Sequence, residues 1–259
     1  MALWTWWPGD PLPAFHASDD FTAHALTDGA DLATLTGLER REVEARLDHG
    51  NRCYVARLGA TAVAYGWVAA GEASIGELDV AFHLADADRY LWDFKTLPAW
   101  RGRGVYPRLL QSILRTEGLT GTRFWIINAP ENRASASGIQ KAGFRVVGDL
   151  AFARDGRAGL VPTADPDRAA IGAALLGVPL IQARASDGVS PCWCCVTQAW
   201  RAGGPAACWP AAALEATPCS CGRPAPEAAA RPAGGANRRA PAHGDHDLGV
   251  VLSARRLRQ

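Results

Sequence analysis

Two glycines set between arginines are the residues of this chain best suited to bind an anion. The sequence Arg101-Gly102-Arg103-Gly104 follows a predicted strand and precedes a predicted amphipathic helix. The first amides of a helix have no partner within the helix, and the helix dipole places positive potential at that end. Glycine lets the backbone approach an anion and adopt positive φ angles. The segment therefore predicts a site for a phosphate or diphosphate group.

The spacing of these glycines does not fit two common nucleotide-binding motifs. The Rossmann fingerprint needs a third glycine about three residues later, but the chain continues Val105-Tyr106-Pro107. A P-loop needs Gly-Lys followed by Ser or Thr, which this segment lacks. We therefore expect a pyrophosphate-sized site of a different kind, with Arg101 and Arg103 adding positive charge beside it.

One element on each side must hold this loop. Residues 89–97 predict a strand that ends at Pro98, because proline has no N–H to donate to a ladder. After the loop, apolar residues at helical spacing predict a helix that closes near Gly118. The apolar stripe of that helix comprises Val105, Leu109, Leu110, Ile113 and Leu114. Alternation along the strand predicts one face with Tyr90, Trp92, Phe94 and Thr96, and another with Leu91, Asp93, Lys95 and Leu97.

The other predicted elements complete an α/β pattern. Thr36-x-x-Glu39 matches a capping box and predicts a helix that ends near residues 49–50. Two apolar runs, 53–58 and 61–68, are joined by Gly59-Ala60 and predict an antiparallel hairpin. A strand over 123–127, a helix over 134–142 and a strand over 144–148 follow. This order predicts an α/β (α+β) fold with a mixed, mostly antiparallel central sheet flanked by helices.

The loop and a second segment downstream resemble the two motifs of the GNAT superfamily of acyl-CoA-dependent N-acetyltransferases. The family's cofactor motif, Arg/Gln-x-x-Gly-x-Gly/Ala, often follows Val-x-Pro, and this chain has Thr96-Leu97-Pro98 and then residues 101–106. The family's Asn-x-x-Ala/Ser and Lys-x-Gly-Phe are matched by residues 132–135 and 141–144. The resemblance covers about residues 30 to 155.

The resemblance implies transfer of an acetyl or short acyl group from acetyl-CoA, the co-substrate, to an amine that attacks the thioester directly. Backbone amides of the loop would bind the CoA pyrophosphate, and the strand end before it would pair with the pantetheine arm. An amide there would polarise the thioester carbonyl. The cofactor-binding residues so implied are Thr96, Leu97, Arg101, Gly102, Arg103, Gly104, Val105, Tyr106, Asn132, Ser135 and Lys141.

Two positions depart from the family pattern. Tyr106 stands where the cofactor motif ends in Gly or Ala, so its ring must point away from the diphosphate. Ile139 stands where the family often has a tyrosine that protonates the leaving thiolate. A thiolate leaves readily, since a free cysteine thiol has a pKa of ~8.5, so this acid is helpful rather than essential. The change favours, as an alternative, a catalytically silent CoA-binding or regulatory module with a zinc-binding or interaction tail.

The general base is left open between two carboxylates. Asp93 lies in the strand that leads to the loop, and Glu77 lies in the preceding segment. Asn132 would sit near the pantetheine or the acceptor and is the third candidate for the catalytic site. The simpler interpretation of Asp93 is an ion pair with Lys95 or Arg89.

The cysteines gather at the other end of the chain. Six of seven fall within 30 residues: Cys192, Cys194, Cys195, Cys208, Cys219 and Cys221. Zinc takes four such ligands, but the spacings are C-x-C rather than the C-x₂-C of zinc knuckles. Disulfides would need an oxidising compartment. The sequence favours a weakly ordered Ala/Pro/Gly-rich tail with incidental cysteines, and a tail that makes functional contacts stays an alternative.

Composition bounds the remaining expectations. The chain has 259 residues with 27 basic and 26 acidic side chains, which gives no reason to expect a nucleic acid partner. The longest apolar run, 169–181, is too short to cross a bilayer and contains glycine and proline. The first residues lack the basic n-region and the cleavage site of a secretory signal, so we expect a cytoplasmic protein. We further expect a monomer or homodimer that acts on a small-molecule or peptide amine. We expect three parts: an acyl-CoA-binding domain over 1–160, an apolar connecting segment over 161–185, and a Cys-rich extension over 186–259.

Overall fold

The computed structural model describes residues 1–14, 20–76, 78, 80–118, 122–152, 157–163 and 165–182. The helices are α1 (Gly29–Thr36), α2 (Arg40–Asp48), α3 (Val105–Glu117), α4 (Arg133–Lys141) and α5 (Pro166–Leu176), with a short 3₁₀ helix over Pro98–Trp100. The first strands are β1 (Ala2–Trp6), β2 (Phe21–Leu26), β3 (Arg52–Leu58), β4 (Thr61–Ala69), β5 (Glu72–Ile75) and β6 (Val80–His83). The later strands are β7 (Asp88–Thr96), β8 (Arg123–Asn128), β9 (Arg145–Phe152) and β10 (Ala158–Pro162).

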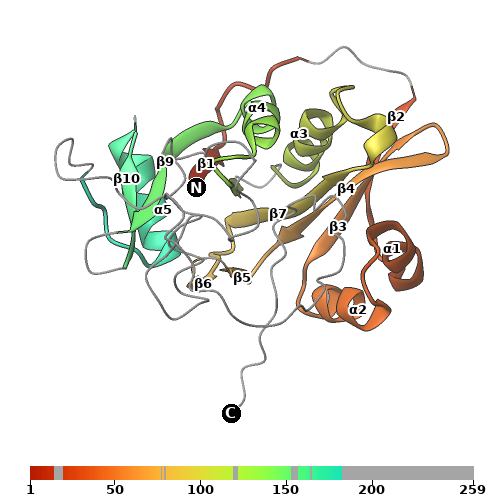
Figure 1. Cartoon of the computed structure of the whole chain (residues 1–259), viewed down its shortest axis with the longest axis horizontal. Helices are drawn as coiled ribbons and strands as arrows, with labels where there is room; N and C mark the ends of the chain where they lie inside the picture. The colour runs from red at the N-terminus through yellow and green to blue at the C-terminus, as the bar shows by residue number, and fades with distance from the viewer. Residues whose placement is uncertain are drawn as a thin grey trace, which may run out of the picture. The chain divides into compact units, whose positions relative to one another are not determined.

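Eight strands form one sheet in the order β10-β9-β1-β8-β7-β4-β3-β2, and β5 and β6 form a separate hairpin (Figure 1). Within the large sheet only β7 and β8 are parallel neighbours. The predicted mixed, mostly antiparallel sheet flanked by helices is therefore confirmed. The hairpin of β3 and β4, with its turn at Gly59-Ala60, is also confirmed.

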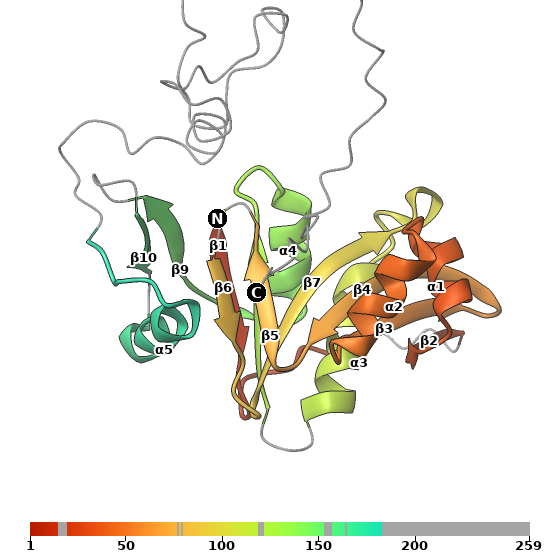
Figure 2. The same cartoon turned by 90° about the horizontal axis from the view of Figure 1, so that it is seen from below.

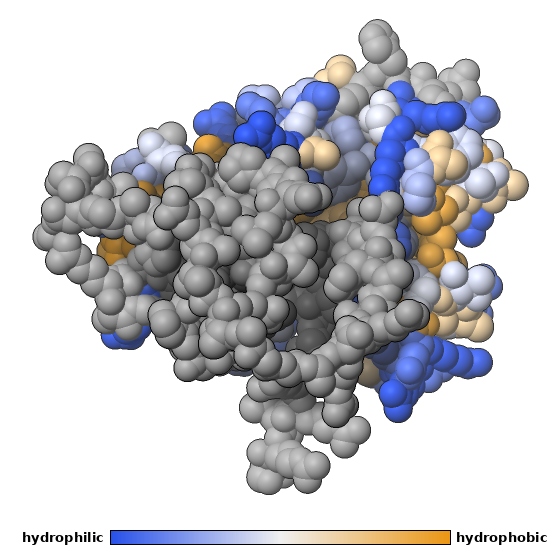
Figure 3. Space-filling model, viewed as in Figure 1, coloured by the Kyte–Doolittle hydropathy of each residue, from blue (hydrophilic) through white to orange (hydrophobic). Residues whose placement is uncertain are grey.

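Helices cover both faces of the sheet (Figure 2). α3 and α4 pack on one face, where the predicted stripe of α3 is buried together with Ile126 of β8 and Ile139 of α4. α1, α2, α5 and the β5–β6 hairpin lie on the other face. There Phe82 of β6 stacks edge-on against Tyr90 of β7, with ring centroids 5.3 Å apart. Hydrophilic side chains gather in the region of α2, at the lower right of Figures 1 and 3.

The capping-box prediction is wrong. Thr36 is the last residue of α1, and its hydroxyl donates to the carbonyl oxygen of Leu32 at 2.7 Å. Gly37 follows with φ +77°, so the chain turns there and a second helix, α2, begins at Arg40. The predicted helix is therefore α2, which has Glu39 rather than Thr36 as its N-cap and ends as predicted with His49 as its C-cap. α1 is a further helix before it, closed by the left-handed Gly37.

Both ends of the described chain are folded more extensively than the sequence predicts. β1, in the Trp-rich segment with no clear period, lies between β8 and β9 in the middle of the sheet. The expected connecting segment 161–185 begins inside β10 and contains α5. β10 pairs with β9, and the backbone of Ile181 donates to the carbonyl of Leu160 at 2.9 Å. Over its described residues this segment is therefore part of the folded unit rather than a linker.

No helix among the described residues is long and apolar enough to cross a membrane.

Candidate functional site

The large sheet divides where β7 and β8 part. These two strands pair in parallel over four residues, from Asp88 opposite Arg123 to Leu91 opposite Ile126. Beyond that point β8 stays with β1 as far as Asn128, while β7 stays with β4 as far as Thr96. The side of β7 that faces β8 therefore has no strand partner from Trp92 onward in the described chain. Backbone N–H and C=O groups on such a side are available to a ligand.

The loop predicted to bind an anion lies at the end of this opening. Gly102 and Gly104 have φ angles of +74° and +69°, a conformation that glycine adopts without steric cost. Gly104 is the N-cap of α3 and supplies no capping side chain, so the first amides of α3 stay uncapped by a side chain. A Cβ built on either glycine meets no atom within 4 Å, so both glycines border open space. The predicted strand–loop–helix context of the anion site is present.

The two arginines of the loop lie on its exposed surface. The Arg101 Nε donates to the carbonyl oxygen of Thr96 at 3.2 Å, which folds the side chain back along the strand end. The Arg103 guanidinium lies over the Trp100 ring at 4.9 Å, a distance typical of a cation–π contact. Both guanidinium groups are thus held by residues that come just before the loop, Thr96 and Trp100.

The backbone that should meet the pantetheine arm is only partly free. The N–H of Leu97 donates to the carbonyl oxygen of Val63 on the β4 side at 2.9 Å. Because successive residues of a strand direct their N–H groups to opposite sides, the N–H of Thr96 is directed toward the opening. Of the two residues named from the sequence, Thr96 is thus the better placed to donate a backbone hydrogen bond.

Tyr106 turns its ring away from the loop. Its ring lies 5.5 Å from that of Phe94, and its hydroxyl is 3.4 Å from the Ser135 Oγ on α4. A Cβ on Gly138 would come within 2.4 Å of the Tyr106 ring, so the ring packs directly on the α4 backbone. Burial raises the pKa of the phenol well above its usual value. Val105, beside it, is buried in the core.

The second motif forms the start and body of α4. The side chain of Asn132 caps the helix, its Oδ1 accepting from the backbone N–H of Ser135 at 2.9 Å. Lys141, the last residue of α4, is exposed. Ile139, at the position of the family's tyrosine, is fully buried in the core and has no proton to give. The structure thus gives Asn132 a helix-capping role that the sequence analysis did not assign to it.

A β-bulge places Asp93 on the face of the sheet that carries α2. Between the pairs Tyr65–Lys95 and Trp67–Trp92, β7 has two residues, Asp93 and Phe94, opposite the single Gly66 of β4. Asp93 has a φ of +49°. Bulges re-aim side chains, and here the predicted alternation is wrong from Asp93 onward. Asp93 shares the face of Trp92 rather than that of Leu91.

Asp93 is indeed in an ion pair, but its partner is neither Lys95 nor Arg89. The Arg46 Nη1 on α2 donates to the Asp93 Oδ2 at 2.6 Å. The Arg46 guanidinium also lies 5.0 Å from the Trp67 ring and 4.5 Å from the Trp92 ring. Arg46 was not singled out from the sequence, because its contacts depend on the bulge and on the packing of α2.

Arg89 instead pairs with a carboxylate at the end of α3. The Glu117 carboxylate accepts from the Nε of Arg89 at 3.2 Å and from the hydroxyl of Tyr54 at 2.8 Å, and it pairs with Arg52. The Glu117 side chain is 6% exposed, so this buried carboxylate joins β3, β7 and α3. Burial, and next the Glu117 charge, raise the pKa of Tyr54.

Two other sequence predictions lie outside the described residues. Glu77 is one of them, and the six cysteines considered as zinc ligands are the others. Among the residues that the structure describes, no group of three or more His, Cys, Asp or Glu side chains could hold a metal ion.

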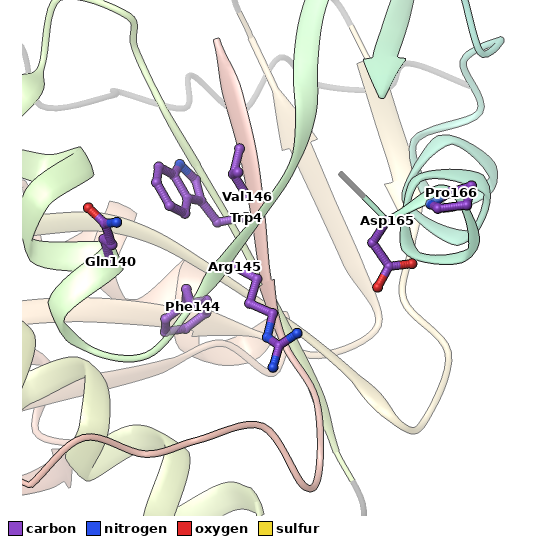
Figure 4. Close-up of a pocket in the computed structure, with 7 residues that line it drawn as sticks. All are labelled: Trp4, Gln140, Phe144, Arg145, Val146, Asp165 and Pro166. Atoms are coloured by element: carbon purple, nitrogen blue, oxygen red, sulfur yellow. The ribbon is translucent and has the colours of Figure 1, made fainter. Parts of the chain in front are cut away.

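A separate hollow of about 550 Å³ lies on the β9 side of the sheet (Figure 4). It shares none of its lining residues with the loop. The residues that line it are Trp4, Gln140, Phe144, Arg145, Val146, Asp165 and Pro166.

Comparisons with known proteins give matches among solved structures. No protein-family model matches the chain, and no curated protein matches it in sequence. The chain is similar to a GCN5-related N-acetyltransferase from Kribbella flavida at 15% identity and a TM-score of 0.37, covering 56% of this chain and 53% of that one. It is similar to an IAA acetyltransferase from Bacillus cereus at 14% identity and a TM-score of 0.38, covering 51% of this chain and 81% of that one.

A third similar structure is the aminoglycoside acetyltransferase AAC(6')-Ib in complex with coenzyme A and kanamycin, at 17% identity and a TM-score of 0.41. The match covers 53% of this chain and 91% of that one. The chain spans about half the length of the Kribbella protein. The three neighbours are acetyltransferases, and the Kribbella protein carries the name of the family that the two motifs resemble.

Proposed function

We propose that this chain transfers an acetyl or short acyl group from acyl-CoA to an amine. The observation that carries the proposal is the parting of β7 and β8 after the Leu91–Ile126 pair, directly before the uncapped N-terminus of α3. An extended chain with a diphosphate at one end fits such a place, because the free strand side offers backbone groups and the helix end offers amides.

The loop residues fit the diphosphate. Gly102 and Gly104 expose their backbone to open space at positive φ, so the amides around them can converge on one anion. Arg101 and Arg103 lie beside these amides with their guanidinium groups on the exposed surface. The positive charge favours a group that carries negative charge, which an acidic loop would repel.

Two residues of β7 would act on the two reactants: Thr96 on acyl-CoA and Asp93 on the acceptor amine. The Thr96 N–H is directed into the opening and would hold the pantetheine arm as a neighbouring strand would. When bound, acyl-CoA supplies a thioester whose carbonyl carbon an amine can attack directly. Asp93, three residues earlier and on the α2 face, would hold the acceptor as its ammonium ion and receive its proton.

A catalytically silent CoA-binding module is the second candidate function. Ile139 favours it, because this buried side chain replaces the family's proton donor and the described residues place no other acid at that position. The two functions share the CoA site and differ only in turnover.

The test is a binding measurement followed by a turnover measurement on the full chain. Calorimetric titration with CoA and acetyl-CoA should give saturable binding. Release of free CoA, separated by chromatography, is then followed with a panel of amines: a diamine, a polyamine, amino acids, peptides and kanamycin. Amine-dependent release supports the enzyme, and binding without release by any amine supports the silent module. Absence of CoA binding would exclude both.

A further inference from the structure

We propose that Arg46 is a positioning residue that fixes the Asp93 carboxylate with one oxygen held and the other open to the acceptor amine. The inference rests on the proposed function, in which Asp93 meets the acceptor. It assigns to α2, a helix outside the two sequence motifs, a part in the reaction.

The backbone at Asp93 does not hold the carboxylate in place by itself. Asp93 occupies the left-handed region at φ +49°, which is uncommon for a residue with a Cβ. The bulge depends on close packing, since a Cβ on Gly66 would stand 2.1 Å from the Phe94 ring. This packing sets where the Asp93 Cα lies, but a contact to the side chain must fix the direction of the carboxylate.

Arg46 provides that contact from a rigid setting. Its side chain is 8% exposed and that of Asp93 is 13% exposed, so the 2.6 Å pair is largely shielded from water. The guanidinium lies over the rings of Trp67 and Trp92, which are neighbours on β4 and β7, and its Nη2 donates to Glu42, one turn earlier on α2, at 2.8 Å. A planar guanidinium that lies over two aromatic rings and donates from two nitrogens has little freedom to rotate.

The pair uses only one oxygen of the carboxylate. Arg46 donates to Oδ2, and Oδ1 accepts no hydrogen bond from the described residues. A carboxylate has acceptor capacity on both oxygens, so Oδ1 can receive an N–H of the acceptor while Oδ2 stays held. Loss of Arg46 would leave the Asp93 carboxylate free to rotate, and orientations in which it can receive the acceptor N–H would become rarer.

The test compares three variants on the full chain: Arg46→Ala, Arg46→Lys and, as the control on the same helix, Arg40→Ala. Arg40 is exposed and pairs only with the exposed Glu44 among the described residues, so its loss should change neither kcat nor KM. For Arg46→Ala we expect kcat for the amine to fall roughly tenfold or more, with the Kd for CoA unchanged. Ethylguanidine at millimolar concentration should restore part of kcat by filling the space over the two tryptophan rings that Arg46 vacates.

The outcomes separate this inference from the proposed function. A wild-type chain that transfers no acyl group to any amine overturns both. An active wild type with unchanged kcat in Arg46→Ala overturns the positioning role alone, as does a fall in kcat that ethylguanidine does not restore. If Arg46→Ala does not fold, Arg46→Lys decides. It keeps the positive charge but loses the planar fork and its stacking on the rings, and we expect lower kcat with an unchanged Kd for CoA. Wild-type kcat in that variant would refute the role.

Discussion

Leu91 of β7 lies opposite Ile126 of β8, and this is the last pair that joins the two parallel strands. Each strand then follows its other neighbour, β7 with β4 and β8 with β1. The N-terminal strand β1 stays paired with β8 beyond the point where β7 leaves it, as far as Asn128.

Replacing Gly102 with Asp should weaken CoA binding by about tenfold or more. The new carboxylate would lie next to the amides that we propose bind the diphosphate, and it would repel that group. Gly37→Asp is the matched control, since Gly37 has a φ of +77° against +74° for Gly102, and a Cβ at either position meets nothing within 4 Å. Calorimetric titration measures both. Equal Kd values for the two variants would remove the diphosphate from this loop.

Replacing Gly138 with Ala should lower the free energy of unfolding by about 1–3 kcal/mol. The added Cβ would stand 2.4 Å from the ring of Tyr106, which is packed against Phe94 and cannot retreat freely. Urea denaturation gives the change, with the exposed Ser137→Ala on the same helix as control. In the double variant with Tyr106→Ala, the effect of Gly138→Ala should largely vanish. Simple additivity would show that the two residues are not in contact.

Replacing Glu117 with Gln should lower the free energy of unfolding by about 3 kcal/mol. The carboxylate is buried and is paired with Arg52 and Arg89, so its loss leaves two guanidinium groups without their counter-charge. The Kd for CoA should not change, because Glu117 lies at the opposite end of α3 from the loop. A stable variant with weaker CoA binding would contradict both parts of this expectation.

Asp10 should make stability depend on pH in the acid range. Burial raises the pKa of this carboxyl, but hydrogen bonds from Arg168 and from the N–H of Trp7 lower it by more than burial raises it. The net pKa therefore lies below the usual value. Because the pKa is lower in the folded state, ionised Asp10 stabilises the protein at pH values above the unfolded pKa of ~3.9. This stabilisation is lost as the pH falls through the folded pKa. The urea concentration at the unfolding midpoint should therefore decrease as the pH drops below about 4. In Asp10→Asn this part of the decline should be absent and stability at pH 6 lower.

The thiol of Cys53 should be inert in the folded chain. Cys53 is fully buried, and burial, with the nearby Asp93 charge, raises the pKa of its thiol to about 12. At pH 8 only ~1 in 10⁴ of such thiols is ionised, and the thiolate is the reactive form. Iodoacetamide followed by mass spectrometry should leave Cys53 unmodified in native protein and modify it in urea. If Cys53 in the native protein reacted as fast as a free thiol in solution, that would contradict its burial.

The sequence was most informative where local patterns decide structure. The stripe of α3, the hairpin at Gly59-Ala60 and the glycine loop follow from spacing and turn chemistry, and each is present. The direction of the Asp93 side chain could not be predicted from the sequence, because the bulge depends on Gly66 in another strand and on the packing of Phe94 over it. The place of β1 could not be read either, since five residues among tryptophans carry no period long enough to indicate a strand.

Hydrogen exchange with and without acetyl-CoA tests the central claim most directly. If acyl-CoA lies along β7 and ends at the start of α3, the amides of Thr96 and of residues 102–106 should exchange more slowly when it is bound. The amide of Leu97, already bonded to Val63, should change little. Protection confined to other segments, such as the start of β9 beside the separate hollow, or no protection at saturating acetyl-CoA, would contradict the account.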